Sequence, residues 1–154
     1  MEWLESTALA EWVRTDLVGY PLVLTVHSIG MAIMVGLVSM VDLRLLGAFR
    51  RVPYTALDNL LRVAWYGLAI NFLTGAAIFT SQAVFYTTSW IFILKMVMVV
   101  GGSILAAVMQ PRIRRNAAAW VESAAVPSGI KTLAAVSLVM WLTAIVAGRF
   151  TAYL

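Results

Sequence analysis

Four long apolar segments limit what the chain can fold into more than any other feature of its sequence. They run near residues 17–41, 63–86, 90–109 and 130–148. Each can cross a hydrocarbon core of about 30 Å, which takes about 20 helical residues. All four are too long for barrel strands and do not alternate polar with apolar residues. We therefore predict an all-α integral membrane protein, a single domain over residues 1–154 built as a bundle of four transmembrane helices.

The composition agrees with lipid as the solvent of this chain. Hydrophobic residues make up 62% of it and charged residues 12%, against about 45–50% and about 25% in soluble domains. The absence of cysteine excludes disulfides, zinc–thiolate sites, iron–sulfur clusters and thiol nucleophiles. The net charge of +4 does not predict nucleic acid as a partner, because the basic residues follow the membrane topology.

Basic residues lie mostly on one side of the predicted bundle. Eight of the eleven lysines and arginines fall in or beside the loops at 42–62 and 110–129, whereas Arg14 and Arg149 lie on the opposite side. The positive-inside rule then places both loops in the cytoplasm. We therefore expect a multi-pass protein of the bacterial inner (plasma) membrane with its N-terminus and C-terminus outside.

Three smaller features complete the predicted architecture. Residues 1–15 alternate apolar and charged positions at helical spacing, which predicts a short interfacial helix on the outer surface. Residues 116–125 predict a second surface helix, on the cytoplasmic side, ahead of Pro127. An aromatic belt at the outer interface would be formed by Tyr20, Tyr86, Trp90 and Tyr153.

Each predicted span carries one stripe of small and polar residues, which is typical of a helix-packing face in lipid. We interpret these stripes as packing surfaces rather than ligand contacts. In chain order they are Ser28, Ala32 and Gly36; Gly67, Asn71, Gly75, Ile78 and Gln82; Lys95, Val99, Gly102, Ser103, Ala106 and Gln110; and Ser137, Trp141, Ala144 and Gly148.

Two ionisable residues lie well inside spans, where such groups indicate a functional site. His27 and Lys95 each follow the outer start of a span by a few residues, which places both about 7–9 Å below the outer surface at 1.5 Å per residue. We predict a polar ligand-binding pocket there, with Gln82 and Arg149 near its mouth. The alternative is structural: Lys95 extends to the outer surface and His27 makes one interhelical hydrogen bond.

Charged residues at the inner boundary are interpreted as structural anchors. This group contains Asp42, Arg44, Arg62 and Arg112. Asp42 and Arg44 are two residues apart and so point in different directions on one helix. We expect Asp42 to pair with Arg62 or Arg112, and its replacement by asparagine to lower stability because an arginine would lose its partner.

Several short motifs resemble a family of uncharacterised bacterial four-span inner-membrane proteins marked by H-x-x-G and D-L-R-L-L-G. The resemblance implies the topology above but no activity. The matching segments are His27-Ser28-Ile29-Gly30, Asp42-Leu43-Arg44-Leu45-Leu46-Gly47, Leu73-Thr74-Gly75, Ala83 with Tyr86, Phe92 with Lys95-Met96, and Ser137-Leu138 through Trp141 to Gly148-Arg149. Leu24 stands where such proteins often have glutamate and Gln110 where they often have a second histidine, so two metal or haem ligands of the family are missing.

The residues favour binding over catalysis. No Ser–His–Asp set, paired carboxylates or glycine-rich phosphate loop is visible, so we lean against an enzyme. We expect a non-catalytic membrane component: an accessory subunit of a larger membrane complex or homo-oligomer, or a small lipid- or quinone-binding protein. Electron transfer by haem b, with His27 and a nearby methionine as axial ligands, and copper or metal handling remain alternatives, although the methionines are scattered.

Overall fold

The computed structural model describes residues 2–122 and 125–151, and within them every regular element is a helix. Four helices, α3, α4, α6 and α7, are long and apolar enough to cross a membrane, which confirms the predicted fold of a multi-pass membrane protein. The elements are α1 (Glu2–Glu5), α2 (Ala8–Thr15), α3 (Gly19–Leu46), the 3-10 helix η1 (Tyr54–Ala56), α4 (Leu57–Ser81), α5 (Ala83–Thr88), α6 (Trp90–Glu122) and α7 (Ser128–Phe150).

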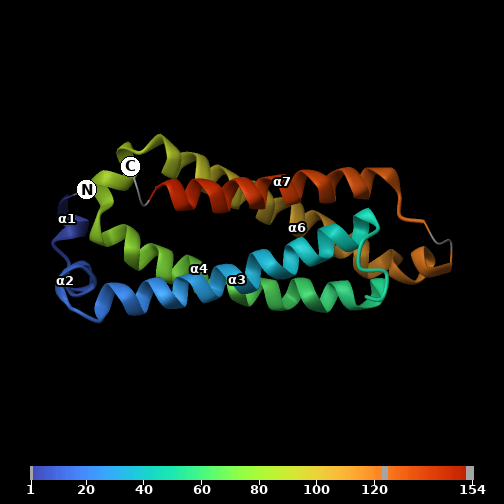
Figure 1. Cartoon of the computed structure of the whole chain (residues 1–154), viewed down its shortest axis with the longest axis horizontal. Coiled ribbons are helices and arrows are strands. Elements are labelled where there is room, and N and C mark those ends of the chain that lie inside the picture. The colour runs from blue at the N-terminus through green and yellow to red at the C-terminus, as the bar shows by residue number, and fades with distance from the viewer. Residues whose placement is uncertain (1, 123–124, 152–154) are drawn as a thin grey trace.

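The four long helices lie side by side as two antiparallel pairs (Figure 1). α3 packs on α4 and α6 packs on α7, while α3 also contacts α7; α4 and α6 meet over a much shorter stretch. α1, α2, the start of α3 and the end of α7 lie at one end of the bundle, here called the terminal end. The turn between α3 and α4 and the start of α7 lie at the other, here called the loop end.

Two glycines bring the backbones of α3 and α4 together. A Cβ atom on Gly67 would lie 2.8 Å from the backbone nitrogen of Met34 and 2.9 Å from the carbonyl oxygen of Gly30. A Cβ atom on Gly30 would lie 3.0 Å from the carbonyl oxygen of Gly67. Since no larger side chain fits between these backbones, the pair sets the separation of the two helices, as small residues do in lipid.

α6 and α7 meet through a small residue opposite a large one. A Cβ atom on Gly102 would lie 2.8 Å from the indole ring of Trp141, and Trp141 is buried. Ala106 of α6 and Ala134 of α7 are also buried. These residues let the two helices approach closely without a polar contact.

The predicted packing stripes are confirmed for three spans and wrong for the first. In α3, Ser28, Ala32 and Gly36 are exposed, and a Cβ atom on Gly36 would meet nothing within 4 Å. The buried face of α3 instead contains Gly30 and Met34. Two residues turn a helix by about 200°, so presenting Gly30 to α4 directs Ser28 and Ala32 away from it. Gln82 is also exposed, unlike the rest of its stripe.

Several predicted boundaries need correction. The second span ends at Ser81, and Gln82 (φ −147°) separates it from the short helix α5. α6 continues through Pro111 to Glu122, whereas the sequence predicted an end at residue 109 and a separate helix at 116–125. Residues 123 and 124 of that predicted helix lie outside the described residues, as does Tyr153.

The predicted interfacial helix is two helices. Ser6 and Thr7 separate α1 from α2, and the side-chain oxygen of Thr7 accepts a hydrogen bond from the backbone nitrogen of Ala10 at 3.3 Å, as an N-cap does. Ala10 and Val13 are fully buried, because α2 packs against α3 and α4. This segment therefore covers the terminal end of the bundle.

Replacing Gly67 by alanine should destabilise the protein, because its methyl group would press on the backbone of α3. The expected loss is about 1–3 kcal/mol, typical of overpacking. Gly36→Ala is the matched control: it meets open space and should leave stability unchanged or raise it by up to about 1 kcal/mol through helix propensity. Thermal unfolding in one detergent compares the two. Equal midpoints for both variants would contradict the close packing at Gly67.

Candidate functional site

His27 joins α3 to α4 through a side-chain hydrogen bond. Its Nδ1 lies 3.0 Å from the hydroxyl oxygen of Thr74. The Thr74 hydroxyl donates its own proton to the carbonyl oxygen of Ile70 at 2.7 Å. Because that proton is already used, Thr74 can only accept from the ring, which assigns the imidazole proton to Nδ1 and leaves Nε2 as an acceptor.

Asn71 holds the other side of the histidine. Its side-chain nitrogen donates to the backbone carbonyl of His27 at 3.0 Å and lies 3.4 Å from the ring Nε2. Gly75 makes room for the ring, since a Cβ atom there would be 3.2 Å from Cε1. Both ring nitrogens thus face α4. A haem iron would need Nε2, and it would have to displace Asn71, so these residues do not fit a haem.

Lys95 extends from α6 alongside α7. A Cβ atom on Gly148 would lie 3.6 Å from both Cδ and Cε of Lys95, so this glycine accommodates the aliphatic part of the lysine. His27, by contrast, faces α4, and no hydrogen bond joins these two predicted pocket residues among the described residues. Among the described residues, Lys95 forms no ion pair with a carboxylate.

The other two predicted pocket residues lie at the terminal end. Gln82 is exposed at the break between α4 and α5. Arg149 is exposed in the last turn of α7, directly after Gly148. Asn71 and Thr74 contact His27. The sequence predicted Asn71 only as a packing residue and Thr74 only as part of a motif. The signal that could have identified them is their spacing of three residues on one helix face.

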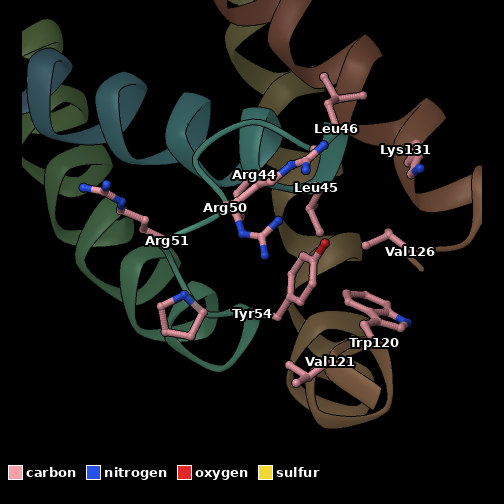
Figure 2. Close-up of a pocket in the computed structure, with 12 residues that line it drawn as sticks. Arg44, Leu45, Leu46, Arg50, Arg51, Tyr54, Trp120, Val121, Val126 and Lys131 are labelled. Atoms are coloured by element: carbon pink, nitrogen blue, oxygen red, sulfur yellow. The ribbon is translucent and has the colours of Figure 1, made fainter. Parts of the chain in front are cut away.

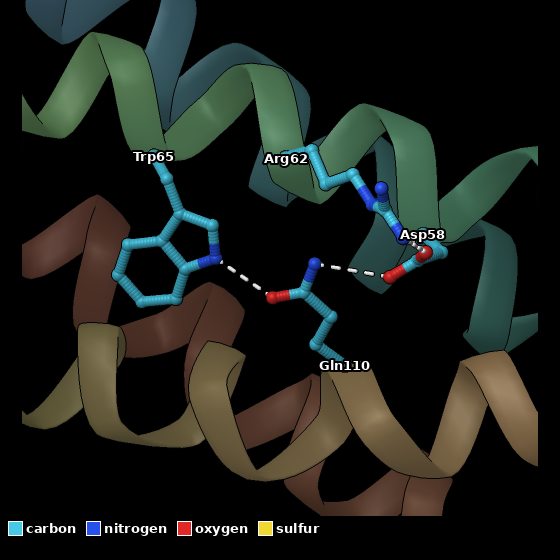
Figure 3. Close-up of polar contacts among 4 residues, drawn as sticks. All are labelled: Asp58, Arg62, Trp65 and Gln110. Carbon is cyan, nitrogen blue, oxygen red and sulfur yellow. Dashed lines mark hydrogen bonds and ion pairs between the residues drawn. The ribbon is translucent and has the colours of Figure 1, made fainter.

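Figure 3 shows a second polar group, which joins α4 to α6 nearer the loop end. The Trp65 indole nitrogen donates to the Gln110 side-chain oxygen at 2.8 Å, and the Gln110 amide nitrogen donates to Asp58 at 3.0 Å. The guanidinium of Arg62 pairs with the other oxygen of Asp58 at 2.9 Å. Each of these four side chains has a partner, so this hydrogen-bonded group stabilises the contact between α4 and α6.

The predicted pairing of Asp42 with Arg62 or Arg112 is wrong. Arg62 pairs with Asp58, four residues earlier on its own helix, which is the standard helical spacing for such a pair. Arg112 is exposed. Asp42 is fully buried, and neither of its carboxyl oxygens makes a hydrogen bond. Ser137 of α7 is the polar side chain that faces it, but the Ser137 hydroxyl also lacks a partner that satisfies hydrogen-bond geometry.

Arg44, the remaining predicted anchor, is buried but forms no ion pair with a described carboxylate. Its Nε donates to the carbonyl oxygen of Val52 at 2.6 Å. Its guanidinium carbon lies 3.8 Å from the ring centre of Tyr54, a cation–π contact. Arg44 thus holds the turn between α3 and α4 against the end of the bundle.

An apolar groove of about 580 Å³ lies between α4 and α6, two long helices that contact each other less than α3 and α4 or α6 and α7 do. Its walls include Trp65, Leu68 and Phe72 from α4 and Met96 and Val100 from α6. None of the predicted ligand residues lines it. A surface of this kind suits lipid chains, so the groove adds no chemistry to the site.

No family model matches the chain, and neither curated proteins nor solved structures gave a match. Within residues 2–122 and 125–151, no three histidine, cysteine, aspartate or glutamate side chains come together as a metal site would require. The function must therefore be inferred from the arrangement of the side chains described above.

Replacing Asp42 by asparagine should leave the stability of the protein unchanged or raise it, contrary to the expectation from sequence. A buried carboxyl without a partner costs free energy, and the substitution removes its charge while keeping its shape. Asp58→Asn is the matched control, because it weakens the contact with Arg62 and should cost about 1–3 kcal/mol. Thermal unfolding measures both. A loss at Asp42 as large as at Asp58 would show that Asp42 has a stabilising partner.

Proposed function

We propose that the protein is a non-catalytic component of the membrane that binds a membrane-soluble ligand at Lys95. The proposal rests on the ammonium group of Lys95. It lies within a membrane span and forms no ion pair with any described carboxylate. Burying such a charge costs at least about 2.5–3.5 kcal/mol on insertion scales, and an oxygen acceptor on a ligand would offset that cost.

The neighbouring groups favour a ligand with a carbonyl or phosphate oxygen. Both ring nitrogens of His27 face residues of α4, and an imidazole is neutral or cationic, so His27 does not neutralise Lys95. The head group of a quinone or a lipid carries suitable oxygen atoms and reaches this depth from the bilayer. A Soret band in the purified protein would instead favour the haem alternative.

The proposal also covers the membrane, the topology and the family of the protein. Eight basic residues lie towards the loop end, which supports a cytoplasmic loop end and an outward terminal end in a bacterial inner membrane. Membership of the four-span family with the H-x-x-G and D-L-R-L-L-G motifs is also proposed, on those motifs alone. Assembly into a homo-oligomer or as an accessory subunit of a larger membrane complex remains a prediction.

Replacing Lys95 by methionine should abolish ligand-induced stabilisation. A short-chain quinone and a phosphatidylethanolamine are suitable probes, added to the purified protein in detergent. A ligand at 100 times its Kd stabilises the folded state by about 2.7 kcal/mol, which a thermal shift detects.

Lys95→Met should lose that shift while its unliganded form is at least as stable as the parent, because an unpaired charge has been removed. Asn59→Met, at an exposed position of α4, controls for non-specific effects of the probe. If the methionine variant at position 95 keeps the full shift, Lys95 does not bind the ligand.

Single cysteines at Ser6 and Ser128 should report opposite sides of the membrane. The chain has no native cysteine, and both serines are exposed. A membrane-impermeant thiol reagent added from the periplasmic side should label position 6 and leave position 128 unlabelled until the membrane is permeabilised. The reverse pattern would place the basic loops outside and invert the proposed topology.

A further inference from the structure

A pocket of about 730 Å³ opens at the loop end of the bundle, away from His27 and Lys95. The last turn of α3, the turn that follows it, the end of α6 and the start of α7 enclose it (Figure 2). One wall is apolar and contains Leu45, Trp120 and Val126. The pocket therefore combines an apolar wall with access from the water-facing end of the bundle.

The charges around this pocket are all positive. Arg44 lies beside Tyr54, Arg50 borders the pocket from the turn after α3, and Lys131 lies on the opposite wall at the start of α7 (Figure 2). Arg51 also borders the pocket, but its head group points away from the others. The residues that line the pocket include no aspartate or glutamate. Within the described part of the chain, none of these four cations forms an ion pair.

Arg44 is held in place before any ligand arrives. It is only 8% exposed, its Nε donates to the carbonyl oxygen of Val52, and its guanidinium carbon lies over the Tyr54 ring. Trp120 supports Tyr54 edge-on, with their ring centres 6.1 Å apart. With Nε and one face of the guanidinium engaged, the terminal nitrogens remain for a ligand. A fixed guanidinium loses little entropy on binding and suits the paired oxygens of a phosphate.

We propose that this pocket binds a phosphate group through Arg44, Arg50 and Lys131. Three cations, from α3, the turn after it and α7, line one pocket without a described carboxylate as counter-ion, and a phosphate supplies both the negative charge and several acceptor oxygens. The apolar wall at Trp120 and Val126 would contact the part of the ligand next to the phosphate. Such a ligand is the head group of an anionic phospholipid or a soluble phosphate compound.

The position of the pocket makes both sources accessible. It lies at a membrane boundary, where juxtamembrane basic residues attract anionic lipids by about 1 kcal/mol each. The same opening admits a phosphate compound from the aqueous phase. This site is independent of the proposal for Lys95, which concerns the other half of the bundle.

The test compares two double variants that remove the same charge. Arg50→Gln with Lys131→Gln removes two exposed cations of the pocket and leaves the buried Arg44, whose loss would also perturb folding. Arg114→Gln with Arg115→Gln removes two exposed cations of α6 that do not line the pocket. Binding of phosphatidylglycerol, phosphatidylcholine and inorganic phosphate is measured by thermal shift and native mass spectrometry on detergent-solubilised protein.

We expect the pocket variant to bind phosphatidylglycerol about tenfold or more weakly than the parent, a change of ~1.4 kcal/mol, and the control variant to bind it nearly as the parent does. Inorganic phosphate that binds to the parent and displaces the lipid would support a soluble phosphate ligand; a lack of competition would support the lipid head group. Equal weakening in both double variants would overturn the proposal, as would equally tight binding of phosphatidylcholine.

Discussion

The close approach of α3 and α4 at Gly30 and Gly67 is the contact on which the rest of the bundle depends. A hydrocarbon solvent gives no hydrophobic reason for two apolar helices to associate, so close packing and interhelical hydrogen bonds must hold them together. With the backbones in contact at these glycines, Asn71 can reach the backbone carbonyl of His27, and Thr74 can reach its ring. The polar contacts in the terminal half of the bundle thus follow from a steric feature one turn away.

Polar side chains inside the bundle differ in whether they have a hydrogen-bond partner. Trp65, Gln110 and Asp58 form a chain in which each group has a partner, and such a network makes a helix contact specific. Asp42 lies fully buried without a partner, although arginines occupy nearby positions in the sequence. The difference arises from helix geometry, because Arg44 projects from another face of α3 and contacts Tyr54 instead. Proximity in sequence therefore says little about which charges meet in a membrane helix.

The helix count and lipid-facing composition were predictable because apolar length alone decides them. The stripe Ser28, Ala32 and Gly36 was misleading, since small residues at four-residue spacing occur on lipid faces as well as packing faces. The partners of His27 depend on the rotation of α3 relative to α4, which one sequence does not specify. The loop-end pocket was not predicted either. Tyr54 and Trp120 are 66 positions apart, and only the continuation of α6 beyond Pro111 brings them together.

The two ends of the bundle differ in how their charges are balanced, and this difference bears on function. In the terminal half, His27 is satisfied by α4 and a single ammonium is left over. At the loop end, several cations share one pocket that no described carboxylate neutralises. Mutual repulsion among them lowers the stability of the empty pocket and increases the gain from a bound anion. Both arrangements leave positive charge that the described residues do not neutralise, and this is the physical reason why we propose a ligand at each.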